Sequence, residues 1–288
     1  MHWNDLSLFF ADINWKEYAK QNGLKRRIDV IAHISYKNKY SLKITRLPEE
    51  FLTIKNPIPL PSGSPSFVDL RSKFPICYDQ GQLGSCTANA LVAAYEYLVP
   101  GFNFSRLFVY YNERVIENDV KYETGVYMHE GINALETHGI PLEKDWPYTI
   151  SMFATKPPQE VYTSALKHKV IKAYNITQTI NNMKSLLHSG TPFVFGFVVF
   201  KEFQSYTVSI TGLVPYPNSA SVAMGGHACL CCGFNDTVKC PGAPPGAWLV
   251  RNSWGTGWGL NGYFWLSYNY LIDHNLSSDI WYLETTTG

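Results

Sequence analysis

The sequence reads Gln80-Gly81-Gln82-Leu83-Gly84-Ser85-Cys86 immediately before a run of residues with helical periodicity. Apolar residues recur at helical spacing from Leu91 to Leu98, and Pro100-Gly101 ends the run. Ser85 is expected to cap the start of this helix. Cys86 would then stand in the first turn, where the positive end of the helix dipole favours the thiolate, the reactive form of a cysteine.

Two segments far downstream carry the groups that a reactive thiolate requires. They read Gly225-Gly226-His227-Ala228 and Arg251-Asn252-Ser253-Trp254-Gly255. His227 can act as the base for the thiol, and Asn252 can orient the imidazole by accepting a hydrogen bond from its second nitrogen. The side-chain amide of Gln80 and the backbone N–H of Cys86 can bind an oxyanion. The residues therefore predict a nucleophilic centre built from Cys86, His227, Asn252 and Gln80.

Three blocks of sequence occur in a fixed order, and further short segments lie between them. The blocks are 80–86, 226–228 and 252–263, and the segments between them are Gly139-Ile140, Trp146-Pro147-Tyr148 and Pro192-Phe193-Val194. Together they resemble the papain family of cysteine peptidases over roughly residues 67–282. The chain resembles an atypical member, because its N-terminal extension lacks the helical signature of the common propeptide.

The resemblance implies an α+β, two-lobed papain-like fold, in which a helical lobe and a β-barrel-like lobe enclose the active-site cleft. It implies a cysteine-type endopeptidase that hydrolyses polypeptides through a Cys86 acyl-enzyme, with His227 as base and then acid, and with no cofactor or metal. Trp254 would shield the His227–Asn252 bond on the leaving-group side. The other substrate-binding residues implied are Gly125, Val126, Tyr127, Met128, Gly196, Ala228 and Asp279.

The main substrate pocket is the one that would hold the substrate residue two places before the cleaved bond. The orientation of Asp279 decides which side chains we expect it to accept. The floor of that pocket is expected near Ser277, Ser278 or Asp279. An inward carboxylate would accept basic side chains, whereas an outward one would leave the pocket apolar, and the outward orientation is the one we expect.

Two other functions use the same residues. A transpeptidase or ligase would form the same acyl-enzyme and pass the acyl group to an amine instead of water. A catalytically silent peptide-binding protein would keep only the cleft, and the intact set of four polar groups argues against it.

Several positions depart from the family pattern. Leu83 stands where a disulfide-forming cysteine is usual, so packing alone is expected to hold its loop. Thr87 replaces an aromatic residue and is expected to loosen the local packing. The long spacing between His227 and Asn252 is expected to reflect a loop over Asn235–Gly246.

The chain divides into three expected segments. They are an extension over 1–65, a helical lobe over 66–168 and a β-rich lobe over 169–288. The extension contains a proline-rich connector over 56–65, a helical pattern between Trp3 and Trp15, and two strands within Arg27–Ile44. We expect the extension to cover the cleft and inhibit it, or else to enlarge the fold as an extra domain.

Net charge, apolar runs and cysteine content limit the partners and the cellular location that we expect for the protein. The formal net charge of +1 gives no field that would recruit nucleic acid or an anionic membrane. The longest apolar run, Pro192–Phe200, is too short to span a bilayer, and the N-terminus does not read as a secretory signal. We therefore expect a protein that is cytoplasmic or packaged in a particle, with its six cysteines mostly reduced.

Some residue clusters are expected to have structural roles rather than to bind a metal or a substrate. Cys229, Cys231, Cys232 and Cys240 match no common zinc spacing and are expected to be buried thiols, with zinc as the alternative. Glu113, Arg114 and Glu117 are expected to form a solvated helix face. Tyr110 and Tyr111 are expected to pack within their lobe.

Overall fold

The structure is a computed structural model that describes residues 40, 42–43 and 54–285 of the chain. The helix expected between Trp3 and Trp15 lies outside the described residues. So do the two strands expected within Arg27–Ile44, apart from Tyr40, Leu42 and Lys43.

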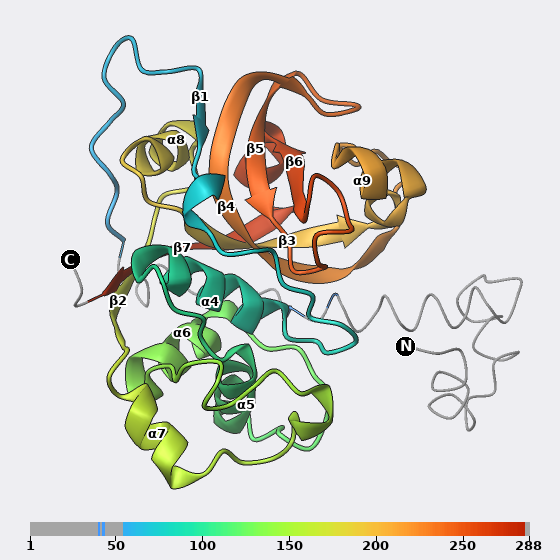
Figure 1. Ribbon diagram of the computed structural model, residues 1–288. Coiled ribbons are helices and arrows are strands. Elements are labelled where there is room, and N and C mark those ends of the chain that lie inside the picture. The colour runs from blue at the N-terminus through green and yellow to red at the C-terminus, as the bar shows by residue number, and fades with distance from the viewer. Residues whose placement is uncertain (1–39, 41, 44–53, 286–288) are drawn as a thin grey trace, which may run out of the picture.

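The described chain forms a two-lobed α+β fold, with helices on one side and an antiparallel sheet on the other (Figure 1). The helical lobe contains α4 (Cys86–Leu98), α5 (Arg106–Ile116), α6 (Met128–His138), η3 (Ile150–Met152) and α7 (Gln159–Ala165). The strands are β1 (Phe67–Asp69), β2 (Val170–Asn175), β3 (Phe193–Phe200), β4 (Ala223–Lys239), β5 (Pro245–Arg251), β6 (Tyr263–Ser267) and β7 (Ser277–Thr285). Short helices accompany the sheet: η2 (Arg71–Lys73), α8 (Ile180–His188), η4 (Lys201–Gln204), α9 (Tyr206–Thr211) and α10 (Tyr268–Ile272).

The sheet has the strand order β2-β7-β3-β4-β5-β6, and β1 pairs with β4 away from this path. All of these pairings are antiparallel. The short β1 precedes the helical lobe in the sequence, yet it lies in the sheet, where Val68 faces Phe234. The chain therefore crosses from the sheet to the helices just before Cys86 and returns at β2.

Helix α4 lies between the rest of the helical lobe and the sheet, where it packs against β3, β4 and β7 (Figure 1). Nearly all of its residues are buried, from Cys86 to Tyr97. Such a helix has no solvated face, because both lobes cover it. The first residue of α4 is consequently held by contacts from both lobes.

The serines that precede α5 and α4 have different roles. Ser105 caps α5 by accepting a hydrogen bond from the N–H of Phe108. Ser85 does not cap α4, which corrects our expectation; its hydroxyl lies 2.6 Å from the hydroxyl of Tyr148 instead. The residue before Cys86 thus serves the tertiary structure rather than the helix end.

The segment expected as a loop over Asn235–Gly246 is mostly strand. Strand β4 continues to Lys239 and β5 begins at Pro245, and these two residues face each other. The extra residues between His227 and Asn252 therefore lengthen a hairpin instead of forming a loose loop.

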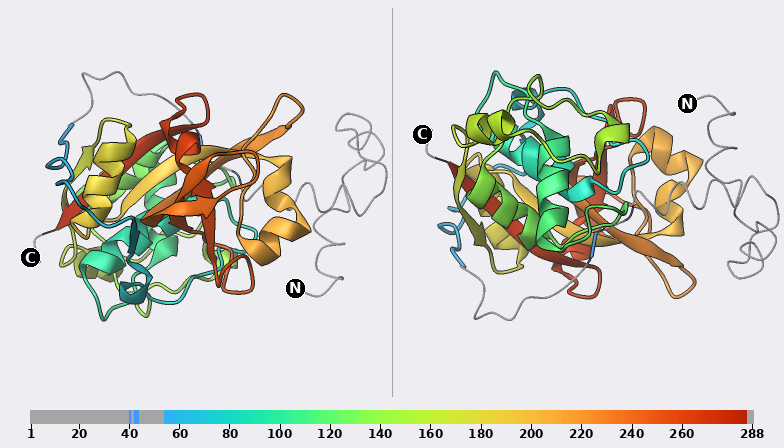
Figure 2. Two further views of the ribbon diagram at one scale, coloured as in Figure 1. Left: turned by 90° about the horizontal axis from the view of Figure 1, so that it is seen from above. Right: turned by 90° about the horizontal axis from the view of Figure 1, so that it is seen from below.

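Residues 54–66 run along the outside of the fold beside α8, as the blue segment in Figures 1 and 2 shows. Lys55 Nζ lies 2.5 Å from Glu284 Oε1. The side-chain oxygen of Asn56 accepts from the N–H of Thr177 at 2.8 Å, and its side-chain nitrogen donates to the Thr177 hydroxyl at 3.0 Å. This proline-rich segment is fastened to the sheet lobe at its beginning.

Of the helices in the described part of the chain, none combines the length and the apolar character needed to cross a bilayer.

Candidate active site

Cys86 is the first residue of α4, and the loop before it is held by several hydrogen bonds. Gln80 Nε2 donates to the carbonyl of Leu83 at 2.8 Å, and the Tyr148 hydroxyl donates to the carbonyl of Gln80 at 2.9 Å. The N–H of Gly84 donates to a carboxylate oxygen of Glu123 at 3.0 Å. Leu83 is buried in the helical-lobe core. The expectation that packing alone holds this loop is therefore wrong.

His227 and Asn252 are brought together by neighbouring strands of the sheet. His227 lies on β4, and Asn252 directly follows β5, which pairs with β4. His227 Nε2 lies 2.9 Å from Asn252 Oδ1, which also accepts from the N–H of Ser253 at 2.8 Å. Because this oxygen accepts, Nε2 carries the proton and Nδ1 is the nitrogen left for proton transfer.

Aromatic rings enclose the imidazole of His227. The ring of Trp254 stacks on it at a centroid distance of 5.3 Å and an interplanar angle of 29°. The rings of Phe197 and Phe203 lie at 5.7 Å and 6.4 Å. His227 and Asn252 are buried, so their hydrogen bond is protected from competition with water.

Gln80 is tied directly to the segment that carries Asn252. Its backbone N–H donates to the carbonyl of Ser253 at 2.8 Å, and the Ser253 hydroxyl donates to Gln80 Oε1 at 2.5 Å. The N–H of Gly255 donates to the carbonyl of Tyr78 at 2.9 Å. These bonds join the loop of the nucleophile to the β lobe.

Cys229 lies beside Asn252 and within electrostatic range of Cys86. Its sulfur lies 3.8 Å from Asn252 Oδ1. Burial raises the pKa of Cys229 well above its ordinary value, and the neighbouring Cys86 thiol raises it further. The structure thus brings Cys86, Asn252, His227 and Gln80 to one region where α4 meets β4.

The cleft contains residues of the chain's own N-terminal extension. The N–H of Leu42 donates to the carbonyl of Gly226, and the N–H of Lys43 donates to the carbonyl of Val126, both at 3.1 Å. The ring of Tyr40 meets His227 edge-on at 5.9 Å. Sequence reasoning placed the extension over the cleft but did not find these residues, because nothing in their local sequence marks them.

Two residues expected to line the main substrate pocket, Gly196 on β3 and Ala228 on β4, face each other in the sheet. A Cβ atom built on Gly196 would lie 2.5 Å from a methyl carbon of Leu42 and 3.8 Å from Asp279 Oδ2. Met128 is fully buried and belongs to the same apolar cluster as Leu42 and Ala228. The absent side chain at Gly196 therefore makes the room that Leu42 fills.

Asp279 points inward, toward Gly196, whereas the sequence favoured an outward orientation. It has a left-handed backbone with φ of 57°, and its carboxylate accepts from the hydroxyl of Ser278 at 2.8 Å. Burial raises the pKa of Asp279, and the nearby His129 opposes that rise. Gly196 is thus flanked by an apolar side chain, that of Leu42, and by an acidic one, that of Asp279.

The predicted solvated face on α5 is wrong for two of its three residues. Glu113 and Arg114 are fully buried. The hydroxyl of Thr87 donates to Glu113 at 2.8 Å, and burial raises the pKa of Glu113 to about 8. Arg114 donates to backbone carbonyls, those of Tyr110, Val120, Tyr122 and Phe153. Thr87 therefore anchors the start of α4 rather than loosening it.

Glu117, the third residue of that face, lies at the rim of the cleft. One carboxylate oxygen accepts from the N–H of Tyr127 at 3.4 Å, and the other pairs with Lys43 of the extension. Its side chain is only 10% exposed. Glu117 and His129 therefore join Tyr40, Leu42 and Lys43 among the described residues near the cleft that sequence reasoning missed.

The remaining cysteines lie inside the sheet lobe. All six cysteines of the chain are buried thiols. Cys229 and Cys231 belong to one apolar cluster and Cys232 to another, as the alternation of a strand requires. Within 40, 42–43 and 54–285, no group of three or more His, Cys, Asp and Glu side chains is arranged to hold a metal ion.

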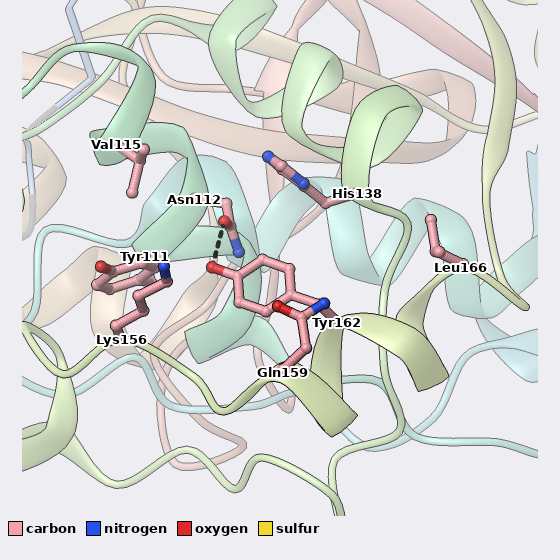
Figure 3. A pocket seen from close by; sticks show the side chains of 8 residues that line it. All are labelled: Tyr111, Asn112, Val115, His138, Lys156, Gln159, Tyr162 and Leu166. Carbon is pink, nitrogen blue, oxygen red and sulfur yellow. Dashed lines mark hydrogen bonds between the residues drawn. The ribbon is translucent and has the colours of Figure 1, made fainter.

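A second concavity lies on the helical lobe, between α5, α6 and α7 (Figure 3). In it the Tyr162 hydroxyl donates to Asn112 Oδ1 at 2.9 Å. The residues that line it are Tyr111, Asn112, Val115, His138, Lys156, Gln159, Tyr162 and Leu166. None of the catalytic candidates is among them, so this groove is separate from the cleft.

Comparisons with known proteins agree with this geometry. A model of the papain family cysteine proteases matches residues 64–282. An uncharacterized peptidase C1-like protein of Acanthamoeba polyphaga mimivirus is 42% identical over 223 residues, which cover 73% of this chain and 70% of the relative.

Solved structures agree as well. Xylellain, a cysteine protease from Xylella fastidiosa, has 34% identity and a TM-score of 0.77, and the match covers 87% of this chain and 97% of that one. A digestive procathepsin L of the Tenebrio molitor larval midgut shares the fold, with a TM-score of 0.68 over 98% of each chain at 17% identity. The chain is therefore a thiol protease that belongs to the papain family of cysteine proteases.

Proposed function

We propose that this chain is an endopeptidase that cleaves polypeptides through a Cys86 acyl-enzyme. The sulfur of Cys86 forms a bond to the carbonyl carbon of the substrate, and His227 holds the thiol proton as an imidazolium. His227 then gives that proton to the leaving amine as the C–N bond breaks. Water attacks the resulting thioester, His227 takes a proton from that water, and the sulfur leaves and recovers the proton.

Asn252 and Gln80 have distinct parts in this proposal. The bond from His227 Nε2 to Asn252 Oδ1 fixes the imidazole so that Nδ1 serves the sulfur. An amide suffices, because the imidazolium is already balanced by the thiolate. Gln80 Nε2 and the backbone N–H of Cys86 would stabilise the oxyanion, and losing one such donor typically costs about 10²–10³ in rate.

The observation that carries the proposal is the peptide in the cleft. Leu42 and Lys43 donate backbone hydrogen bonds to Gly226 on one wall and Val126 on the other. Tyr40, from the same segment, touches His227. A cleft that pairs with extended backbone from both sides, next to a nucleophile and a base, suits a polypeptide substrate.

The same contacts support inhibition by the extension. The segment passes from Tyr40, against Trp254 at 5.6 Å, to Lys43, against Val126. A substrate would run the other way, because its leaving amine lies on the Trp254 side and its acyl part on the Val126 side. The extension therefore fills the cleft in a direction unsuited to cleavage, and we propose that it keeps the enzyme inactive until it leaves.

The main pocket suggests which substrates are accepted. Leu42 fills it, so an apolar residue fits at the second position before the cleaved bond. The inward carboxylate of Asp279 would also accept a basic side chain long enough to reach it. We propose that the pocket takes both kinds of side chain.

The contacts of the connector shift the proposed domain boundary. Lys55 and Asn56 are bonded to the sheet lobe, and the N–H of Asp236 donates to the carbonyl of Ser66 at 2.9 Å. We propose that the catalytic unit begins near Ile54 rather than at residue 66, and that only the residues before it act as an inhibitor.

Thiol labelling of the full-length chain tests the nucleophile. An irreversible thiol-directed epoxide, followed by peptide mapping, should modify Cys86 in preference to the five other cysteines, because burial raises the pKa of each of those five thiols. His227→Ala should abolish this preference. Labelling spread over several cysteines, or labelling of Cys86 that is unaffected by His227→Ala, would contradict the assignment.

Peptide turnover tests the reaction and its control. A chain that begins at Ile54 should cleave unstructured peptides faster than the full-length chain, and equal rates would exclude inhibition by the extension. Products joined to an added amine in preference to water would indicate a ligase. Peptide binding without turnover by either chain would indicate a silent binding protein.

A further inference from the structure

Glu117 and Tyr127 form a small site for a cation beside the main substrate pocket. The N–H of Tyr127 donates to Glu117 Oε1 at 3.4 Å, which orients the carboxylate. Glu117 Oε2 pairs with the ammonium group of Lys43, and that ammonium also lies 5.6 Å from the centre of the Tyr127 ring. The cation is thus held by a carboxylate and by an aromatic ring.

Charge and burial both favour a cation at this place. The Glu117 side chain is 10% exposed, whereas that of Lys43 is 38% exposed. A sheltered carboxylate without a partner is unfavourable, so departure of Lys43 would leave a vacant site for another cation.

The position of Lys43 identifies the substrate residue that this site would meet. Leu42 fills the pocket at Gly196, and the next residue, Lys43, reaches Glu117. Neighbouring residues of an extended chain point in opposite directions, so adjacent substrate residues can fill the pocket and the Glu117 site together.

We propose that Glu117 and Tyr127 select a lysine or arginine at the third position before the cleaved bond, when the second position fills the Leu42 pocket. This inference rests on the proposed endopeptidase function. In the inhibited chain Lys43 occupies the site, so one carboxylate both holds the extension and selects the substrate.

A matched set of peptides tests the selection. The enzyme is the full-length chain with Leu42→Gly and Lys43→Ala, which removes the side chains that fill the pocket and the Glu117 site. The peptides carry leucine at the second position before the cleaved bond and lysine, glutamine or glutamate at the third. We expect kcat/KM to be about fivefold higher for lysine than for glutamine, and lower still for glutamate. Equal kcat/KM for the three peptides would overturn the proposal.

Substitutions in the same background locate the effect. Glu117→Gln should remove the preference for lysine, and Glu117→Lys should reverse it in favour of glutamate. Glu130→Gln is the control, because Glu130 lies near His129 rather than Lys43 and should leave the preference unchanged. A preference that survives Glu117→Gln would overturn the proposal. Absence of turnover with every peptide, together with unlabelled Cys86, would instead refute the proposed function.

The rate of Cys86 alkylation tests the pairing of Lys43 with Glu117 without requiring substrate turnover. In the otherwise unchanged full-length chain, Lys43→Ala and Glu117→Gln should each speed the alkylation of Cys86 by about two- to fivefold, because each weakens the attachment of the extension. The double variant should be no faster than either single variant, since both remove one interaction. Additive effects, or no effect of either substitution, would show that the two residues do not act as a pair.

Discussion

On the β side of the cleft, His227 lies among the rings of Phe197, Phe203 and Trp254. On the helical side, Cys86 follows a loop that hydrogen bonds attach to Glu123 and Tyr148. Apart from its bond to Asn252, the base is therefore surrounded by apolar packing, whereas polar contacts hold the loop before the nucleophile.

The polar contacts of the helical side include carboxyl groups that change charge near neutral pH. Burial raises the pKa of Glu113 to about 8 and the pKa of Glu96 and Glu123 to about 7. Glu113 accepts from Thr87, the residue after the nucleophile, and Glu123 accepts from Gly84, two residues before it. The support of Cys86 should consequently depend on pH, whereas the aromatic packing around His227 should not.

The largest effect is expected from breaking the aromatic packing. Phe203 is almost fully buried, and its ring lies 5.2 Å from Trp254 and 5.3 Å from Trp258. Phe203→Ala should lower the free energy of unfolding by about 3–5 kcal/mol, to a similar extent at every pH between 5 and 8. Chemical denaturation at several pH values measures this.

Tyr206→Ala is the matched control, because this aromatic residue lies nearby in the sequence but is 81% exposed. It should change stability by less than about 0.5 kcal/mol. A loss for Phe203→Ala that varies strongly with pH would show that the β side is not governed by packing alone.

The next effect is the pH dependence of the helical side. The carboxyl group of Glu113 loses its proton near pH 4.5 in the unfolded chain and near 8 in the folded one, because burial disfavours the charge. Between these values the folded state binds more protons, so stability falls as pH rises, by up to about 1.4 kcal/mol per pH unit. Glu113→Gln should remove this contribution and leave that of Glu96 and Glu123.

Denaturation curves at pH 5, 6, 7 and 8 measure the effect. Glu160→Gln, an exposed substitution in the first turn of α7, should leave the slope unchanged. If Glu113→Gln has the same slope as the unsubstituted chain, Glu113 is ionised in the folded state throughout this range.

Much of the fold follows from local pattern. The longest apolar run, Pro192–Phe200, coincides with the strand β3 over Phe193–Phe200. The helix at Cys86 begins and ends close to its expected positions. In these segments one local signal, apolar periodicity or an apolar run, agrees with the tertiary structure.

The missed features depend on contacts between distant segments. Glu113 and Arg114 read as a solvated face because charged side chains are usually exposed, yet inside the lobe Thr87 donates to Glu113 and four backbone carbonyls accept from Arg114. Ser85 reads as a helix cap, but the hydroxyl of Tyr148 competes for it. Helical periodicity carries no information on such partners, which is why the charged interior was not predicted.

The contacts of the N-terminal extension also depend on segments that are distant in the sequence. Its position before the catalytic blocks suggested that it covers the cleft, but Tyr40, Leu42 and Lys43 have no local mark that sets them apart. Their role depends on the carbonyls of Gly226 and Val126, which lie far away in the sequence. The position of the extension in the sequence could predict that it covers the cleft. Its contacts with the cleft are identified only by the fold.

The smallest effect is expected from a single hydroxyl on the helical side. The Tyr148 hydroxyl donates to the carbonyl of Gln80 and lies 2.6 Å from the hydroxyl of Ser85, while its ring lies 4.0 Å from the guanidinium of Arg106. Tyr148→Phe keeps the ring and removes the hydroxyl, so it should cost about 1–2 kcal/mol of stability. It should also slow the alkylation of Cys86, because the loop that positions the thiol loses one attachment.

Tyr162→Phe separates stability from positioning. Its hydroxyl also makes a part-buried hydrogen bond, to Asn112, but in the separate groove of Figure 3. It should cost a similar amount of stability and leave the alkylation rate of Cys86 unchanged. If both variants slow alkylation equally, the rate reports the overall stability of the helical lobe. If only Tyr148→Phe does, the hydrogen bonds of the loop position the nucleophile, as Asn252 and the packed rings position its base.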